Sequence, residues 1–243
     1  DRLFYRRALA AITRVMEAGP DNWQWTNGLA QERARMLLPL AWLVRVDDTA
    51  EHRRWLRNTA AGMIALQDDC GAIGEELGDP SRGNYPPPAS NEDYGKHEAA
   101  LIQANGDPVA DLLYTTNFAF LGLHEAAAAT GEALFQDAAD RLADFLCRCQ
   151  VRSEERPEID GAWFRAFDFS RWEPWGSDAD AGWGAWAVES GWTQGWITTV
   201  LALRQQRSSL WDLATVCGVG DHLRHHRPKM IPDGIVADVE RMG

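Results

Sequence analysis

The chain has 243 residues, of which 45% are hydrophobic and 25% charged, and its formal net charge is −12. This composition is typical of a folded globular protein, no apolar run reaches the roughly 20 residues needed to cross a bilayer, and the acidic balance argues against a nucleic-acid partner. Twelve residues are Trp, an unusually high number, so their positions become the main clue to function.

Apolar residues recur at helical spacing over residues 2–18, a stretch that Gly19-Pro20 ends. It contains no signal-peptide hydrophobic region, and the sequence does not begin with Met. We therefore expect one domain spanning residues 1–243, or alternatively the later part of a longer chain, and we leave the cellular compartment open.

Three pairs of helices are predicted after this first helix, each broken by a short polar turn. The pairs are 30–46 with 50–67, 108–128 with a partner ending at Gln150, and 189–205 with a partner ending at Val216. Further helices are expected near 92–104 and at the C-terminus. No alternating apolar pattern predicts a confident strand, so the predicted class is all-α.

The first two pairs look like copies of one unit. Superimposing their sequences aligns Leu38 with Leu121, Ala50 with Ala133, and Gln67 with Gln150. Helical repeats of this kind bury their faces against neighbouring copies, and short turns make the two helices of a pair antiparallel.

The connections between pairs, at 19–29, 68–107 and 151–188, are long and should emerge on one rim. Most of the Trp residues lie on these loops or on the helix starts that follow them. Indoles beside many carboxylates favour a cleft for a polar ligand with apolar faces, such as a sugar. The alternative is that each Trp fills a gap beneath a loop. The Trp residues concerned are Trp23, Trp25, Trp163, Trp172, Trp175, Trp183, Trp186 and Trp192.

The turns Gln67–Ile73 and Asp160–Phe164, together with the helix junctions around Arg35–Trp42 and Asp111–Ala126, resemble those of the six-hairpin glycosidases. The unsaturated glucuronyl and rhamnogalacturonyl hydrolases are the most similar branch. The resemblance implies an α/α toroid that acts on an oligosaccharide. Six hairpins need roughly 50 residues each, so this chain holds an incomplete ring or is part of a larger protein.

Glycoside hydrolysis requires two carboxyl groups, which we expect near the starts of the inner helices. Asp111 is the first candidate, Glu189 the second, because indoles around it would raise its pKa, and Asp180 the third. Two of Asp111, Glu189, Asp180, Glu98 and Glu32 should face one cavity with their carboxyl groups about 5–10 Å apart. The alternative is that they point to bulk solvent or cap helices. The predicted substrate-binding residues are Trp23, Trp25, Glu98, Tyr114, Asn117, Trp163, Trp183, Trp186, Trp192 and Gln194.

Neither a cofactor nor a metal is expected, because the sequence has no phosphate-binding loop, nucleophile elbow or CxxC pair. We interpret Cys70, Cys147, Cys149 and Cys217 as buried apolar residues, and the histidines at 222–226 as a basic surface.

Two other classes of protein remain open. One is a non-catalytic sugar-binding or structural toroid. The other is an epimerase or lyase on a similar toroid, which would need two His in the cavity where the rim offers only His97. The acidic balance disfavours a polyanionic substrate, although Arg33, Arg35 and Arg165 could together hold one uronate.

Overall fold

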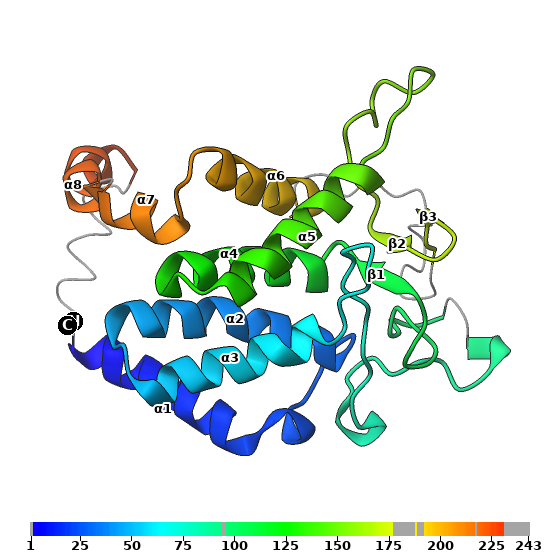
Figure 1. Cartoon of the computed structure of the whole chain (residues 1–243), viewed down its shortest axis with the longest axis horizontal. Coiled ribbons are helices and arrows are strands. Elements are labelled where there is room, and N and C mark those ends of the chain that lie inside the picture. Colours follow the sequence, from blue (N-terminus) through cyan, green and yellow to red (C-terminus); the bar gives the residue numbers. More distant parts are fainter. Residues whose placement is uncertain (1, 94–95, 177–187, 189–191, 217, 231–243) are drawn as a thin grey trace.

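A computed structural model describes residues 2–93, 96–176, 188, 192–216 and 218–230. This part of the chain is predominantly helical, with packed helix pairs and one small three-stranded sheet (Figure 1). None of its helices is long and apolar enough to cross a membrane.

Most of the predicted helices are confirmed with small shifts of their ends, but the one expected over 108–128 begins only at Thr115. The first, α1 (Arg2–Ala18), places Ile12 and Met16 against the core but fully buries none of its residues. The others are α2 (Leu29–Val46), α3 (Ala50–Ile64), α4 (Thr115–Thr130), α5 (Ala133–Cys149), α6 (Trp192–Gln205), α7 (Leu210–Val216) and α8 (Val219–Met230).

Helix α4 is the centre of the packing, with α2, α5 and α6 around it. Most of its residues are buried, because three neighbouring helices leave it little contact with water. It crosses α2 so closely at Gly122 that a Cβ there would overlap with the side chain of Leu37. Glycine is therefore required at this crossing for a steric reason rather than a conformational one.

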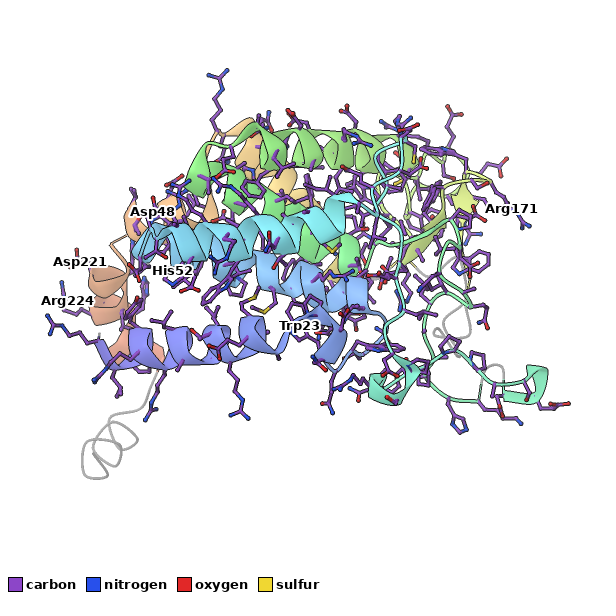
Figure 2. The ribbon with its side chains drawn as sticks, turned by 60° about the horizontal axis from the view of Figure 1, so that its bottom comes forward. Trp23, Asp48, His52, Arg171, Asp221 and Arg224 are labelled. Atoms are coloured by element: carbon purple, nitrogen blue, oxygen red, sulfur yellow. The ribbon has the colours of Figure 1, made fainter. Side chains whose placement is uncertain are left out.

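The long connections gather at one end of the helices, as predicted. Helices α2, α4 and α6 all begin at the end that bears the small sheet and the loops (Figure 1). The helices of the first two pairs run in opposite directions, whereas α7 continues beyond the end of α6 and does not run back beside it, so the expected third hairpin is wrong. Asp48 and His52, at the short turn between α2 and α3, lie far from Arg171, which lies at the loop-bearing end (Figure 2).

The expectation of a purely helical chain is wrong at the loop-bearing end. Strands β1 (Val109–Asp111), β2 (Ala166–Asp168) and β3 (Glu173–Pro174) form an antiparallel sheet in that order, with Ala110 opposite Phe167. Residues 109–111 therefore do not open a helix, which starts only at Thr115. The fully buried residues of β1 and β2 explain why no polar–apolar alternation marked these strands.

The helix expected near 92–104 is also wrong, because the described part of this stretch contains only the end of the 3-10 turn η3 (Asn91–Asp93). A second such turn, η2 (Pro80–Arg82), precedes it, and a third, η1 (Pro20–Asn22), follows α1.

Two helix ends provide a matched test of backbone strain. Helix α4 ends at Gly131 with φ 71°, and α6 is followed by Arg207 with φ 52°, both in the left-handed region that favours glycine. We expect Arg207→Gly to raise the free energy of unfolding by about 0.5–1 kcal/mol. Gly131→Ala should lower it by about 1 kcal/mol, because no described atom lies within 4 Å of the added Cβ and only the strain changes.

Urea denaturation of both variants would measure these effects as opposite shifts of the midpoint at constant m-value. A midpoint that falls in Arg207→Gly would instead mean that the arginine side chain itself stabilises this turn.

Candidate functional site

A group of buried polar side chains lies at the loop-bearing end of α2 and α4, and we call it the buried polar centre. Its members are at most 8% exposed, although they come from five separate stretches of the chain. They are Asn27 and Gln31 at the start of α2, Glu75 from the loop after α3, Asp111 at the end of β1, Thr115 and Asn117 in the first turn of α4, and Arg165 just before β2.

Backbone hydrogen bonds fix the position of Glu75. Its amide donates to the carbonyl of Val109 in β1 (3.1 Å), and the next carbonyl, that of Glu76, accepts from the amide of Leu29 at the start of α2 (2.7 Å). The loop is therefore held between β1 and α2. The absence of a side chain at Gly28 leaves room for the carboxyl group, because a Cβ there would lie 3.0 Å from Glu75 Oε2.

Asp111 is held by three donors on one oxygen. Its Oδ1 accepts from the amides of Leu113 (2.8 Å) and Tyr114 (3.0 Å), which precede α4, and from Arg165 Nη1 (2.9 Å). The ion pair is almost completely buried, with side-chain exposures of 5% for Arg165 and 1% for Asp111. Charge-assisted bonds of this kind orient a carboxylate firmly.

Glu75 differs from Asp111 in its electrostatics. Burial, and secondly the nearby carboxylate of Asp111, raise the pKa of Glu75 to about 8, while Thr115 and Arg165 act in the opposite direction. At neutral pH Glu75 is therefore protonated and able to donate a proton. A neutral carboxylic acid thus lies beside a carboxylate that is paired with a guanidinium.

Several atoms of the buried polar centre have no hydrogen-bond partner among the described residues. They include Glu75 Oε1, Asp111 Oδ2, Gln31 Nε2 and Asn117 Oδ1. Protein interiors satisfy the great majority of buried polar groups, because each unsatisfied one costs stability. A concentration of such atoms at one place is typical of a functional site.

Of the predicted acidic candidates that the structure describes, only Asp111 belongs to this centre. Glu98 is exposed, and Glu32 accepts from the amide of Thr26 (3.2 Å) and pairs with Arg35 (3.1 Å). Glu189 and Asp180 lie outside the described residues. The described acid that accompanies Asp111 is Glu75, which was not among the candidates.

The described Trp candidates divide into buried and exposed ones. Trp23, Trp25 and Trp163 are buried, and their indole nitrogens donate to the backbone carbonyls of Val15 (2.9 Å), Asp79 (2.9 Å) and Leu146 (2.7 Å). Each of these indoles therefore holds a loop in place. Trp183 and Trp186 lie outside the described residues.

The remaining predicted binding residues lie near the starts of α4 and α6. Trp192 is 50% exposed and packs its ring edge-on against Tyr114, with centroids 5.6 Å apart. Gln194 donates to the carbonyl of Trp163 (2.6 Å), and Asn117 donates to that of Leu113 (3.1 Å). Tyr114 and Trp192 thus form an aromatic pair where the two helices begin.

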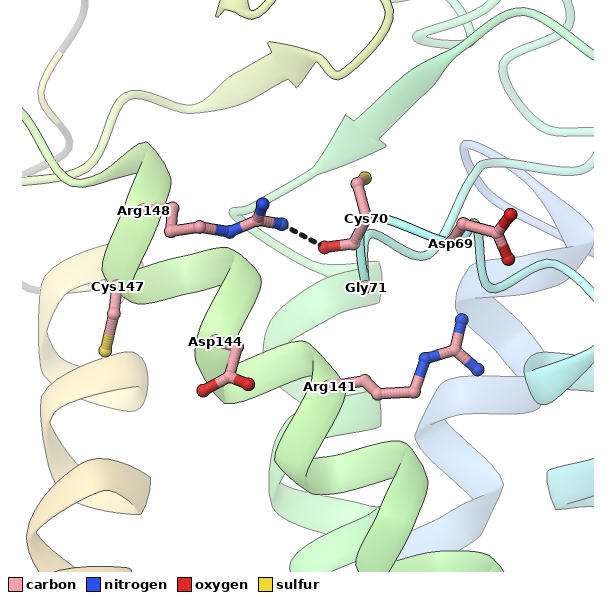
Figure 3. Close-up of a pocket in the computed structure, with 7 residues that line it drawn as sticks. All are labelled: Asp69, Cys70, Gly71, Arg141, Asp144, Cys147 and Arg148. Carbon is pink, nitrogen blue, oxygen red and sulfur yellow. Dashed lines mark hydrogen bonds between the residues drawn. The ribbon is translucent and has the colours of Figure 1, made fainter.

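A separate hollow of about 450 Å³ lies where the turn after α3 meets α5 (Figure 3). Arg148 and Arg141 project into it and donate to the carbonyls of Cys70 and Asp68, so they attach this turn to α5. The expectation that the cysteines are buried is wrong for Cys147, which is exposed, and Cys70 is only half-buried. The reason for the exposure of Cys147 is its helical position, since Cys149 two residues later faces the core; Cys217 lies outside the described residues.

No group of three or more His, Cys, Asp or Glu within the described part of the chain is arranged to hold a metal ion. The side chain of His97 is exposed, and so are those of His222, His225 and His226 on α8.

These observations define a predominantly helical protein of packed helix pairs with a buried polar centre at one end. Comparison of the chain with protein-family models, with curated proteins and with solved structures found no match.

Proposed function

We propose that the protein is a glycoside hydrolase that cleaves an oligosaccharide, on a partial or complete α/α toroid. The observation behind this proposal is the pairing of Glu75, whose pKa is raised to about 8, with Asp111, which Arg165 and two backbone amides orient. Two carboxyl groups in unlike environments are what acid-catalysed glycoside cleavage requires.

The two carboxyl groups would have different roles in this reaction. Glu75, protonated at neutral pH, would donate its proton to the glycosidic oxygen as the bond to the anomeric carbon breaks. Asp111 would act as the base that activates water, or as the nucleophile that attacks the anomeric carbon. Arg165 would be a positioning residue, because it fixes one oxygen of Asp111 and leaves Oδ2 without a described partner.

The choice of a carbohydrate rests on the resemblance to six-hairpin glycosidases and on the aromatic pair of Tyr114 and Trp192 beside the polar centre. Sugars present C–H faces that stack on such rings. The net charge of −12 is unfavourable for a nucleic-acid substrate.

A non-catalytic helical domain is the second candidate. It is favoured by the bonds of Asp111 to the amides that precede α4, and by the buried indoles that donate to loop carbonyls, since both contacts serve the fold. In that case the buried polar centre would only join β1 to α2 and α4.

A glycan panel distinguishes the two candidates. We expect the wild type to hydrolyse at least one oligosaccharide, and Glu75→Gln and Asp111→Asn each to lower kcat/KM by about 10²–10⁴. Glu32→Gln is the matched control, since this carboxylate pairs with Arg35 near the surface, and it should change the rate less than about twofold.

A thermal melt of each variant would show that it folds. Hydrolysis at the wild-type rate by both folded variants would rule out the assignment of Glu75 and Asp111. Binding of a glycan without hydrolysis by the wild type would support the non-catalytic candidate.

A further inference from the structure

Helix α8 carries three histidines that play no part in the proposed function, and the sequence alone suggested only a basic surface for them. The helix lies at the far end of the molecule from the sheet and the loops (Figure 1). Asp221 and Arg224 mark its place in Figure 2, remote from Arg171. Any ligand that these histidines bind is therefore held far from the buried polar centre.

His222 and His226 lie one turn apart on the same face of α8. Residues four apart on a helix are direct neighbours, and this spacing presents two imidazoles to one ion in helices that bind zinc. The two rings are nearly parallel, at 12°, with centroids 6.3 Å apart. Both side chains are exposed, so rotation about their own bonds meets little resistance.

Only a small movement brings these two rings onto a common ion. An imidazole nitrogen binds a divalent transition-metal ion at about 2.0–2.1 Å, which places the centroids of two rings on one ion about 4.5–5 Å apart. The observed centroids are 6.3 Å apart, so they must approach each other by about 1–2 Å. A change of side-chain torsion supplies this shift without moving the backbone.

The third histidine, His225, is oriented differently. Its ring meets that of His226 edge-on, at 89°, with centroids 4.7 Å apart. No three possible metal ligands are arranged around one point in the part of the chain that the structure describes. The geometry therefore favours a site of two histidines, with the remaining coordination positions left to water.

The charges around the pair permit a cation. Arg224 on the same helix is paired with Asp221, so its positive charge is offset nearby. The whole chain has a net charge of −12, which attracts cations to its surface. Neutral imidazole is a ligand for Cu²⁺, Ni²⁺ and Zn²⁺, whereas Mg²⁺ and Ca²⁺ prefer oxygen ligands.

We infer that His222 and His226 form a binding site for a divalent transition-metal ion on the exposed face of α8. The affinity of such a site rises from Ni²⁺ to Cu²⁺ and falls again at Zn²⁺. Because the ion is held only while α8 keeps the turn between its two ligands, binding also stabilises the helix. The site is independent of hydrolysis and goes beyond the proposed function.

Calorimetric titration of the whole chain with NiCl₂, without any added histidine tag, tests the site. Ni²⁺ is the probe because it does not oxidise thiols, and Cys147 exposes one. We expect one ion to bind with a Kd below about 100 µM. Titration with MgCl₂ should show no binding, because the site offers nitrogen rather than oxygen ligands.

Single substitutions identify the two ligands. His222→Ala and His226→Ala should each weaken Ni²⁺ binding at least about tenfold, because a lone imidazole loses the advantage of a second, tethered ligand. Alanine suits exposed helical positions, so neither variant should unfold α8. The matched controls are His225→Ala on the same helix and His97→Ala in an exposed loop, and each should change the Kd less than about threefold.

Hydrogen exchange locates the ion on the fold. Ni²⁺ should slow the exchange of the backbone amides of α8 and leave those of α3 unchanged. The inference is overturned if Ni²⁺ does not bind, if His225→Ala weakens binding as much as His226→Ala, or if the α8 amides exchange equally fast with and without the ion. None of these outcomes depends on hydrolysis, so they leave the proposed function to its own test.

Discussion

Replacing Arg165 with Met is expected to lower the free energy of unfolding by about 3–5 kcal/mol. The guanidinium is 5% exposed and bonds to Asp111, which is 1% exposed. Without it, the Asp111 carboxylate would stay buried beside Glu75 with no compensating charge from the described residues, and a buried unpaired charge is among the most costly defects in a folded protein.

The matched control is Arg171→Met. Arg171 is 71% exposed and lies 3.9 Å from Asp168, so its loss should cost less than about 0.5 kcal/mol. Urea denaturation of both variants measures the difference. The double variant Arg165→Met with Asp111→Asn should recover part of the loss, because it removes the stranded charge. Equal effects of the two arginine substitutions would show that the buried ion pair has no special role.

The helices could be predicted because their pattern is local. Residues 2–18 and 30–46 repeat their apolar side chains over several turns, and the structure places α1 at Arg2–Ala18 and α2 at Leu29–Val46. A period of 3.6 residues sustained over such lengths fits a helix and does not fit the two-residue alternation of a strand. The gathering of the long connections at one end follows directly from short turns within each pair.

The small sheet could not be predicted in the same way. Strand β1 has three residues, all buried, and its partner β2 lies more than fifty residues further along the chain. A strand this short offers no period, and its only support comes from pairing with a distant segment. For this reason residues 109–111 were indistinguishable, in sequence, from the first turn of the helix that follows them.

Of the two carboxyl groups in the candidate site, the sequence predicts Asp111 and misses Glu75, again because the evidence for the second one is not local. Asp111 stood out because it precedes a long apolar helix, whereas Glu75 follows a turn and precedes no predicted helix. Its importance comes from burial and from Asp111, and neither is visible locally. The one signal in the sequence is that a carboxyl group directly follows the apolar, small stretch Ala72-Ile73-Gly74.

The Trp residues show the limit of reasoning from composition. Their predicted positions on loops suggested a cleft, yet Trp25 and Trp163 are buried and donate to the carbonyls of Asp79 and Leu146. An indole ring with its single N–H donor can pack beneath a loop and bond to a backbone carbonyl, and it can equally well stack on a sugar. Composition alone does not distinguish these two roles.

Glu75→Gln is expected to make the protein more stable than the wild type at alkaline pH. The pKa of Glu75 is about 8 in the folded protein and about 4.3 for an ordinary glutamate in the unfolded chain. Between these values the folded state retains a proton that the unfolded state has lost. Raising the pH through this window therefore lowers the free energy of unfolding, by at most about 1.4 kcal/mol per pH unit.

Glutamine matches the neutral form of Glu75 in shape and cannot lose a proton, so the variant should not show this decline. Urea denaturation at about pH 5, 7 and 9 should give similar stabilities at the lowest pH and a gain of several kcal/mol for the variant at the highest. Glu76→Gln, which removes the half-buried partner of Arg33, should show no such gain. Parallel pH curves for wild type and Glu75→Gln would mean that Glu75 is ionised in the folded protein.

If Glu75→Gln gains stability and also loses hydrolysis, the two results together would support a catalytic role for Glu75. A buried carboxyl group that weakens the fold as it ionises gives no structural advantage over glutamine. Active sites commonly retain such groups because their chemistry requires a titratable proton near neutral pH. If Glu75→Gln is both more stable at alkaline pH and inactive, the two effects have one cause, which is the removal of that proton from the buried polar centre.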